Sequence, residues 1–185
     1  NRANALIDQL TEEIKVLIGE YIYSYDGKSI EEVFYDLLKK NNMSVAFCES
    51  CTGGLLASRF TRIPGVSEVL DRGIVTYSNK SKIEELEVNK ETLARYGAVS
   101  EQTAVEMAYG LLQKTDVDIA ISTTGIAGPD SDYSKKPVGL VYIGIAYGNT
   151  CYAVKYHLSG NRIDIQNKTA NLAFNEGRKI ILKNS

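Results

Sequence analysis

Residues 44–62 read SVAFCESCTGGLLASRFTR and join two different structural patterns. The apolar run from Ser44 to Cys48 predicts a buried strand, whereas the segment from Gly53 to Arg62 predicts a helix. The glycines Gly53 and Gly54 permit the sharp turn that such a connection needs. A strand that passes at once into a helix is typical of α/β folds, so this stretch indicates the fold class.

The alternation of strand and helix continues toward the C-terminus. We expect further strands at 73–77 and 117–121, and a hairpin of strands at 139–147 and 151–157. The expected helices lie at 79–87, 90–96, 101–114 and 161–183. Because a hairpin is antiparallel, we predict a three-layer α/β/α sandwich with a mixed central sheet.

The N-terminal segment follows a separate pattern. Apolar residues at helical spacing predict a helix that ends near Gly19, followed by a short strand at 21–23. Ser29 and Glu32 then have the spacing of a capping box, which predicts the start of a second helix. We expect residues 1–28 to be an appendage, the tail of a preceding region, and residues 29–185 to form the functional domain. The first residue is Asn1 and not Met, which favours a fragment of a longer protein.

The composition restricts the classes of partner that the chain can bind. The 185 residues carry a net charge of -2, so the chain has no basic field to hold nucleic acid, and we expect no such partner. The longest apolar stretch, Val138–Tyr147, is about half the length of a membrane-spanning helix, which argues against a membrane partner. Three cysteines, an odd number, fit a reducing compartment and a cytoplasmic location.

The single histidine, His157, restricts the chemistry further. One imidazole excludes a multi-histidine metal site, and we expect no metal. Any Ser-His or Cys-His mechanism would have to use His157, which lies on an alternating strand where a packed or edge-strand histidine is the commoner case. Hydrolytic chemistry in this chain therefore needs a different base.

Ser50 is a candidate nucleophile. It lies in the turn just ahead of a helix, where the backbone N–H groups of Thr52, Gly53 and Gly54 could stabilise an oxyanion. The alternative is that Ser50 or Thr52 only caps that helix.

Lys82 is a candidate base for Ser50. It lies in the first turn of a helix that we expect Asn79 to cap, where the positive end of the helix dipole and burial favour the neutral amine. Tyr77, at the end of the preceding strand, could relay a proton or orient that amine. The alternatives are that Lys82 is a solvated surface lysine and that Tyr77 is a half-buried residue of the strand.

The pair Cys48 and Cys51 has the spacing of a redox or metal motif. Zinc would need a second pair, and the remaining candidates, Cys151 and His157, lie on the distant hairpin. Cys48 also ends a predicted buried strand, where a thiol usually acts as a small apolar residue. A thiol redox protein therefore stays a weaker alternative.

Several linked motifs share their order and spacing with one family: Glu49–Gly54, Pro64–Ser67, Gly73–Asn79 with Lys82, Gly97–Ser100, Gly125–Pro129 and Lys136–Gly139. The chain resembles the CinA C-terminal domain family over about residues 29–182. Active members are amidohydrolases of nicotinamide mononucleotide (NMN), so the resemblance implies hydrolysis of its carboxamide to nicotinic acid mononucleotide and ammonia, in pyridine nucleotide recycling. It implies no metal and no cofactor. It also implies a homodimer and, in full-length relatives, a separate N-terminal domain that is associated with ADP-ribose pyrophosphatase activity.

The resemblance also implies roles for individual residues. By position, Ser50 is similar to the nucleophile, Lys82 to the general base and Tyr77 to its catalytic partner. Thr52 and Gly53 would make oxyanion or substrate contacts.

Further positions would contact the nucleotide. The loop from Thr124 and Gly125 to Gly128 would line its site with backbone donors, or else form only a tight turn between strands. Arg162 would pair with the phosphate of NMN, or else make a surface salt bridge. The chain departs from the family pattern at Asn161, near Gln166 and Asn167, and at Ser131 and Asp132. The altered segment from Asn161 to Asn167, together with the expected missing partner domain, motivates an alternative function, a catalytically silent pyridine-nucleotide-binding or assembly module.

Overall fold

A mixed five-stranded sheet forms the centre of the protein. The computed structural model describes residues 2–131 and 136–184, so Asp132 lies outside the described residues. The strand order is β2-β1-β3-β4-β5, with β1 parallel to β2 and β3, and with β3, β4 and β5 successively antiparallel. The strands are β1 (Val45–Glu49), β2 (Leu70–Val75), β3 (Ile119–Gly125), β4 (Leu140–Tyr147) and β5 (Thr150–His157).

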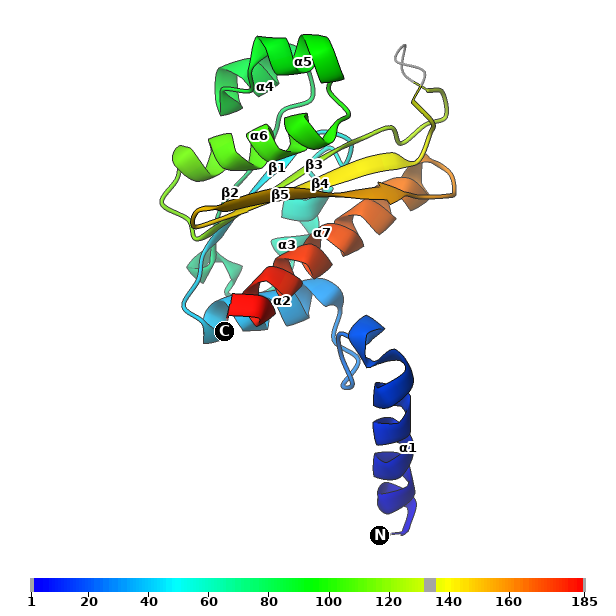
Figure 1. Ribbon diagram of the computed structural model, residues 1–185. Helices are drawn as coiled ribbons and strands as arrows, with labels where there is room; N and C mark the ends of the chain where they lie inside the picture. Colours follow the sequence, from blue (N-terminus) through cyan, green and yellow to red (C-terminus); the bar gives the residue numbers. More distant parts are fainter. Residues whose placement is uncertain (1, 132–135, 185) are drawn as a thin grey trace.

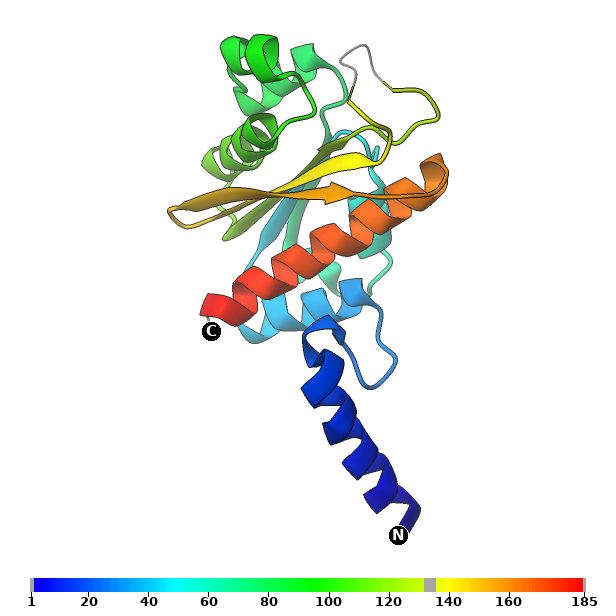
Figure 2. The same cartoon turned by 45° about the vertical axis from the view of Figure 1, so that its right-hand side comes forward.

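Helices cover both faces of this sheet, as Figures 1 and 2 show. One face carries α2 (Ile30–Lys40), α3 (Leu55–Phe60) and α7 (Arg162–Asn184). The other carries α4 (Asn79–Leu86), α5 (Lys90–Tyr96) and α6 (Glu101–Gln113). The predicted three-layer α/β/α sandwich with a mixed sheet is confirmed.

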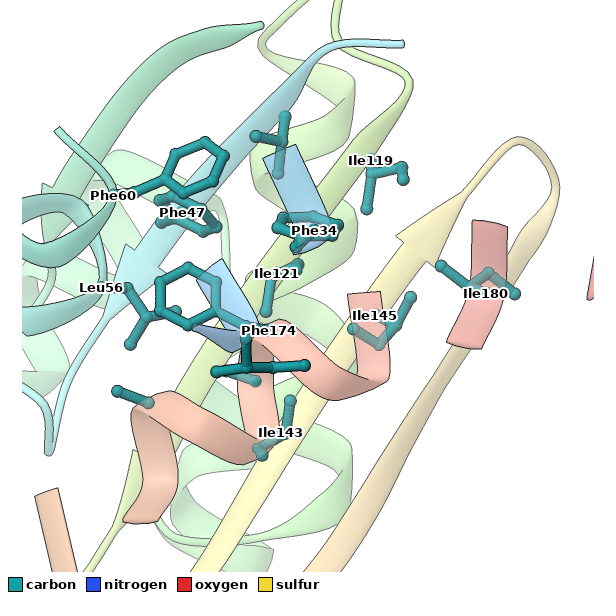
Figure 3. Packing of buried hydrophobic residues seen from close by; sticks show 14 of the residues in the cluster. Phe34, Phe47, Leu56, Phe60, Ile119, Ile121, Ile143, Ile145, Phe174 and Ile180 are labelled. Atoms are coloured by element: carbon teal, nitrogen blue, oxygen red, sulfur yellow. The ribbon is translucent and has the colours of Figure 1, made fainter. Parts of the chain in front are cut away.

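The main core lies under α2, α3 and α7. Alternate side chains of β1 point to opposite faces, so Val45 and Phe47 join this core while Ala46 and Cys48 pack under α6. All four phenylalanines of the chain meet in the main core (Figure 3), with ring centroids 5.5 to 6.1 Å apart. They are Phe34, Phe47, Phe60 and Phe174.

The N-terminal helix α1 (Arg2–Ile18) points away from the sandwich (Figure 1) and contains no buried residue. A short 3₁₀ turn, η1 (Gly19–Tyr21), follows it. The predicted strand at 21–23 is therefore wrong: Ile22 N–H donates to the Gly19 carbonyl at 3.1 Å, and β2 and β5 form the edges of the sheet. The predicted capping box at the start of α2 is confirmed, since Ser29 accepts from Glu32 N–H and Glu32 accepts from Ser29 N–H.

Two helix starts differ from expectation. Helix α3 begins at Leu55 and not at Gly53, because Gly53 and Gly54 have φ angles of +62° and +98°, which a right-handed helix does not accommodate. Helix α4 is capped by Ser78 and not by Asn79, since the Ser78 hydroxyl accepts from Ser81 N–H at 3.0 Å. A second 3₁₀ turn, η2 (Val66–Glu68), precedes β2.

Candidate active site

The carboxyl ends of the three parallel strands meet at one edge of the sheet. The strand order reverses at β1, with the helix after β1 on one face and the helices after β2 on the other. Such a switch point is where open α/β sheets bind ligands. Ser50 follows β1 directly, Thr76 and Tyr77 follow β2, and Thr124 and Gly125 end β3.

Ser50 and Lys82 are brought into contact at this edge. The Lys82 amine (Nζ) lies 3.0 Å from the Ser50 hydroxyl oxygen (Oγ) and is placed to donate to it. Side chains alternate at the end of β1, so Glu49 faces α3 whereas Ser50 faces α4, the helix that carries Lys82. Ser50 is 9% exposed and Lys82 is 0% exposed, so the pair is almost shielded from water.

The Lys82 amine has two further partners, both backbone carbonyls. It donates to the oxygen of Thr76 at 2.7 Å and to that of Tyr77 at 3.2 Å. Burial is the largest influence on this group and lowers the pKa of Lys82 to about 8. In the neutral amine, two N–H groups can stay on the two carbonyls while the lone pair faces the Ser50 hydroxyl. The geometry and the lowered pKa therefore suit Lys82 to act as a base.

The turn after Ser50 leaves two backbone donors free. Ser50 N–H donates to the Thr123 carbonyl at 2.9 Å, and Gly53 N–H donates to the Ser50 carbonyl at 3.2 Å. Within the described part of the chain, the N–H groups of Cys51 and Thr52 donate to no other residue. The Thr52 hydroxyl is buried and shares a 2.7 Å hydrogen bond with that of Thr123. Two unpartnered N–H groups beside a serine are the donors that a developing oxyanion needs.

Tyr77 lies at the rim of the site and is 62% exposed. Its phenol oxygen accepts from Arg162 at 3.2 Å, and the same guanidinium donates to the Gly128 carbonyl at 2.8 Å. Tyr77 thus contacts the Lys82 amine through its carbonyl and not through its phenol. Arg162 ties together the loops that follow β2 and β3.

Thr124 and Gly125 contact neighbouring parts of the fold, the loop before α6 and strand β4. The buried Thr124 hydroxyl donates to the Ala98 carbonyl at 2.7 Å, across to the loop before α6. A Cβ atom at Gly125 would lie 2.7 Å from Val141 Cγ2, so this position needs glycine for close packing against β4. The hydrogen bonds of Thr124 do not involve the Ser50–Lys82 pair.

Cys48 and Cys51 lie in unreactive surroundings, whereas His157 is exposed on the edge strand β5. Cys48 and Cys51 are free and buried, and burial raises the pKa of the Cys51 thiol to about 12 and that of Cys48 still further. A thiol that stays protonated is a poor nucleophile, which disfavours redox chemistry. His157 pairs with Leu140 at the end of β5. Among residues 2–131 and 136–184, no three acidic, cysteine or histidine side chains cluster as a metal would need, and no helix is long and apolar enough to cross a membrane.

A separate polar hollow of about 350 Å³ lies at the opposite end of β1. Its lining includes Ser44 and Lys114, but the Ser44 hydroxyl donates to Asp118 at 3.0 Å and Lys114 pairs with Glu87 at 3.2 Å. This hollow offers no serine activated by a lysine, so we place the candidate site at the carboxyl end of the sheet.

Two residues that contact the turn after Ser50 were not among the predicted site residues. The Glu49 carboxylate is buried and accepts from the N–H groups of Gly54, Leu56 and Ala57 at 3.0 to 3.1 Å. Gln166 donates from its side chain to the Cys51 carbonyl at 2.9 Å. A charged residue at the end of an apolar strand was a signal for Glu49, whereas Gln166 lies more than a hundred residues along the chain from its partner and carried none.

Comparison with known proteins identifies the family. The model of the CinA C-terminal domain family matches residues 27–181. The chain belongs to the CinA family. A CinA-like protein of Kosmotoga olearia is 43% identical to it over 180 residues, which are 97% of this CinA domain and 44% of that relative. The chain therefore spans less than half the length of such curated relatives.

Solved structures of the same superfamily share the fold. The CinA superfamily protein of Klebsiella pneumoniae is 27% identical, with a TM-score of 0.80 over 84% of this chain and 99% of that one. The competence/damage inducible protein CihA of Agrobacterium tumefaciens is 37% identical, with a TM-score of 0.77 over 88% of this chain and 99% of that one. Both proteins are covered almost completely, so their solved chains are close to the sandwich alone.

Proposed function

We propose that this CinA domain hydrolyses the carboxamide of NMN to nicotinic acid mononucleotide and ammonia. The observation that carries the proposal is the 3.0 Å contact between Lys82 Nζ and Ser50 Oγ in a buried site without a nearby imidazole. The choice of NMN among amides is supported by the motifs that the chain shares with active family members.

In the first half of the reaction, Ser50 Oγ attacks the carboxamide carbon while its proton passes to the neutral Lys82 amine. The negative oxygen of the tetrahedral intermediate accepts from the N–H groups of Cys51 and Thr52. The carbon–nitrogen bond then breaks, and Lys82 returns the proton to the leaving nitrogen, so ammonia departs and an acyl ester remains on Ser50.

In the second half, a water molecule attacks the ester carbon and gives one proton to Lys82. The bond from that carbon to Ser50 Oγ breaks, the proton returns to Oγ, and the carboxylic acid leaves. The carbonyls of Thr76 and Tyr77 keep the amine oriented through both halves. The cycle regenerates the free serine and the neutral lysine.

The remaining positions would bind the nucleotide. Arg162 is exposed at the rim, where its guanidinium can meet a phosphate while one nitrogen stays on the Gly128 carbonyl. Thr52 would contribute its N–H. Gly53 leaves room for substrate, because a Cβ atom at this position would meet no other atom within 4 Å. We assign Thr124 and Gly125 to the wall of this site, and Tyr77 to its rim.

The test is ammonia release from NMN by the purified protein. We expect Ser50→Ala and Lys82→Met to lower the rate on the order of 10³-fold or more, because each removes a reacting group. Ser58→Ala and Lys80→Met are matched controls, since both side chains are exposed and lie on the neighbouring helices α3 and α4. Normal turnover by Ser50→Ala would refute the assignment of the nucleophile.

The alternative of a silent nucleotide-binding module is motivated by the departures from the family pattern at Asn161, Gln166 and Asn167. Calorimetry separates the two functions. Binding of NMN without release of ammonia supports the silent module, whereas release that depends on Ser50 supports the amidohydrolase.

A further inference from the structure

The turn that carries the nucleophile is fixed only in part by its own hydrogen bonds, from Gly53 N–H to the Ser50 carbonyl and from Leu55 N–H to the Thr52 carbonyl, both at 3.2 Å. Gly53 and Gly54 both lie in the left-handed region, and glycine moves between left- and right-handed conformations at little cost. No atom lies within 4 Å of a Cβ built on Gly53, so packing does not fix this position either. The free N–H groups of Cys51 and Thr52 therefore need contacts from outside the turn to keep them in place.

Glu49 supplies such a contact on one side. It immediately precedes Ser50, and its buried carboxylate binds the N–H groups of Gly54, Leu56 and Ala57. The residue before the turn is thus bonded to the residues after it, which closes the turn at its base. Hydrogen bonds to an ionised acceptor are roughly twice as strong as neutral ones.

Gln166 supplies a contact on the other side. Its side-chain amide, on the first turns of α7, donates to the Cys51 carbonyl at 2.9 Å. In a planar trans peptide the carbonyl and the following N–H point in opposite directions. Holding the Cys51 carbonyl toward α7 therefore directs the Thr52 N–H away from α7, which covers the sheet face opposite to α4 and Lys82.

We infer that Glu49 and Gln166 are positioning residues that hold the turn from Ser50 to Gly54 in the shape in which Ser50 reacts. This inference rests on the proposed function only in taking Ser50 as the nucleophile. It does not depend on which amide is the substrate.

The experiment measures how fast Ser50 reacts with a substrate-independent probe, an alkyl fluorophosphonate. Ser50 Oγ forms a bond to phosphorus, fluoride leaves, and the serine proton passes to Lys82. We expect labelling of the wild type and none of Ser50→Ala. Glu49→Gln keeps one acceptor oxygen but sets an NH₂ group against at least one of the three backbone donors, so it should react at least tenfold more slowly, and Gln166→Ala about three- to tenfold more slowly.

Two matched controls separate positioning from loss of stability. Asp118→Asn makes the same carboxylate-to-amide change at the other end of β1, where Asp118 accepts from Ser44 N–H at 2.7 Å. Asn167→Ala removes the amide next to Gln166, which bonds only within α7. Both controls should label at the wild-type rate, with all proteins measured well below their melting temperatures.

The outcomes are distinct. Wild-type labelling rates in Glu49→Gln and Gln166→Ala overturn the inference, as does equal slowing by the two controls. If Glu49→Gln does not fold, Gln166→Ala decides alone. A wild type that resists the probe overturns both the nucleophile and its positioning. A wild type that labels but releases no ammonia from NMN overturns the proposed function, while slow labelling of the variants still supports the positioning role.

Discussion

At the scale of single residues, the decisive feature is a lysine amine that is buried beside a serine. Most buried lysines pair with a carboxylate, but the acceptors of Lys82 are the Ser50 hydroxyl and two carbonyls. Neutral acceptors stabilise an ammonium ion less than an anion does, so burial dominates and the pKa falls to about 8. A substantial fraction of the Lys82 amine is therefore neutral near pH 8, as the proposed role of Lys82 as a base requires.

The rate of ammonia release should depend on pH through this amine. Lys82 accepts the serine proton only when neutral, and below a pKa of about 8 the neutral fraction falls tenfold per pH unit. We expect kcat/KM to rise about tenfold from pH 6 to pH 7 and about fivefold from pH 7 to pH 8, and to level off above that. Initial rates between pH 6 and pH 10 check this. A flat profile from pH 6 to pH 8 would contradict Lys82 as the base.

The free energy of unfolding should also depend on pH through Lys82, and it should increase as the pH rises. The pKa of Lys82 is about 8 in the fold and near its ordinary value of 10.5 when unfolded. Between these values the unfolded chain binds more protons, so stability rises with pH. Relative to Lys82→Met, the wild type should gain about 2 kcal/mol between pH 7 and pH 9.5. Urea unfolding of both proteins at the two pH values measures this, and a constant difference would argue against the lowered pKa.

At the scale of elements, Lys82 reaches the site because α4 lies close against α6. Gly110 of α6 makes this possible, since a Cβ there would overlap the carbonyl oxygen of Leu86, the last residue of α4. The capping box formed by Ser78 and Ser81 fixes the other end of α4, one residue after Tyr77. Lys82 is thus positioned by a glycine and a helix cap, neither of which contacts Ser50.

Gly110→Ala should therefore reduce activity from a distance. The added methyl group forces α4 away from α6, at a cost of about 1–3 kcal/mol in stability. Because a shift of about 1 Å at a catalytic group can cost on the order of 100-fold, we expect at least a tenfold loss of kcat/KM. Tyr109→Ala, at an exposed position of the same helix, should have little effect. Thermal unfolding and ammonia release of both variants test this.

Local patterns predicted most of these elements, because hydrophobic periodicity and turn residues are encoded nearby in the chain. The contact between Ser50 and Lys82 could be predicted from the sequence, since each residue follows a strand and parallel strands bring their carboxyl ends together. The strand expected at 21–23 failed because strand formation needs a partner, and the sheet already ends at β2 and β5. Gln166 could not be foreseen, since its contact with Cys51 depends on how α7 crosses the sheet.

At the scale of the whole molecule, α1 stands apart from the sandwich (Figure 2). It contributes no buried residue, although Leu6, Ile7, Leu10 and Ile14 are exposed on it. The sandwich is therefore expected to fold without α1.

Deletion of residues 1–18 tests this expectation. Since the deleted helix buries nothing, we expect a change in Tm of less than about 2 °C and an unchanged kcat/KM. Differential scanning calorimetry and the ammonia assay on the shortened chain provide the measurement. A fall in Tm of more than about 5 °C would show that α1 stabilises the sandwich.

The four clustered phenylalanines also join distant parts of the sequence. Phe34, Phe47 and Phe60 lie on α2, β1 and α3, whereas Phe174 lies on α7, which also carries Arg162 and Gln166. Contacts between distant parts of a sequence form late in folding. We therefore expect the docking of α7 to complete the aromatic core and the contacts of the turn after Ser50 in the same late step.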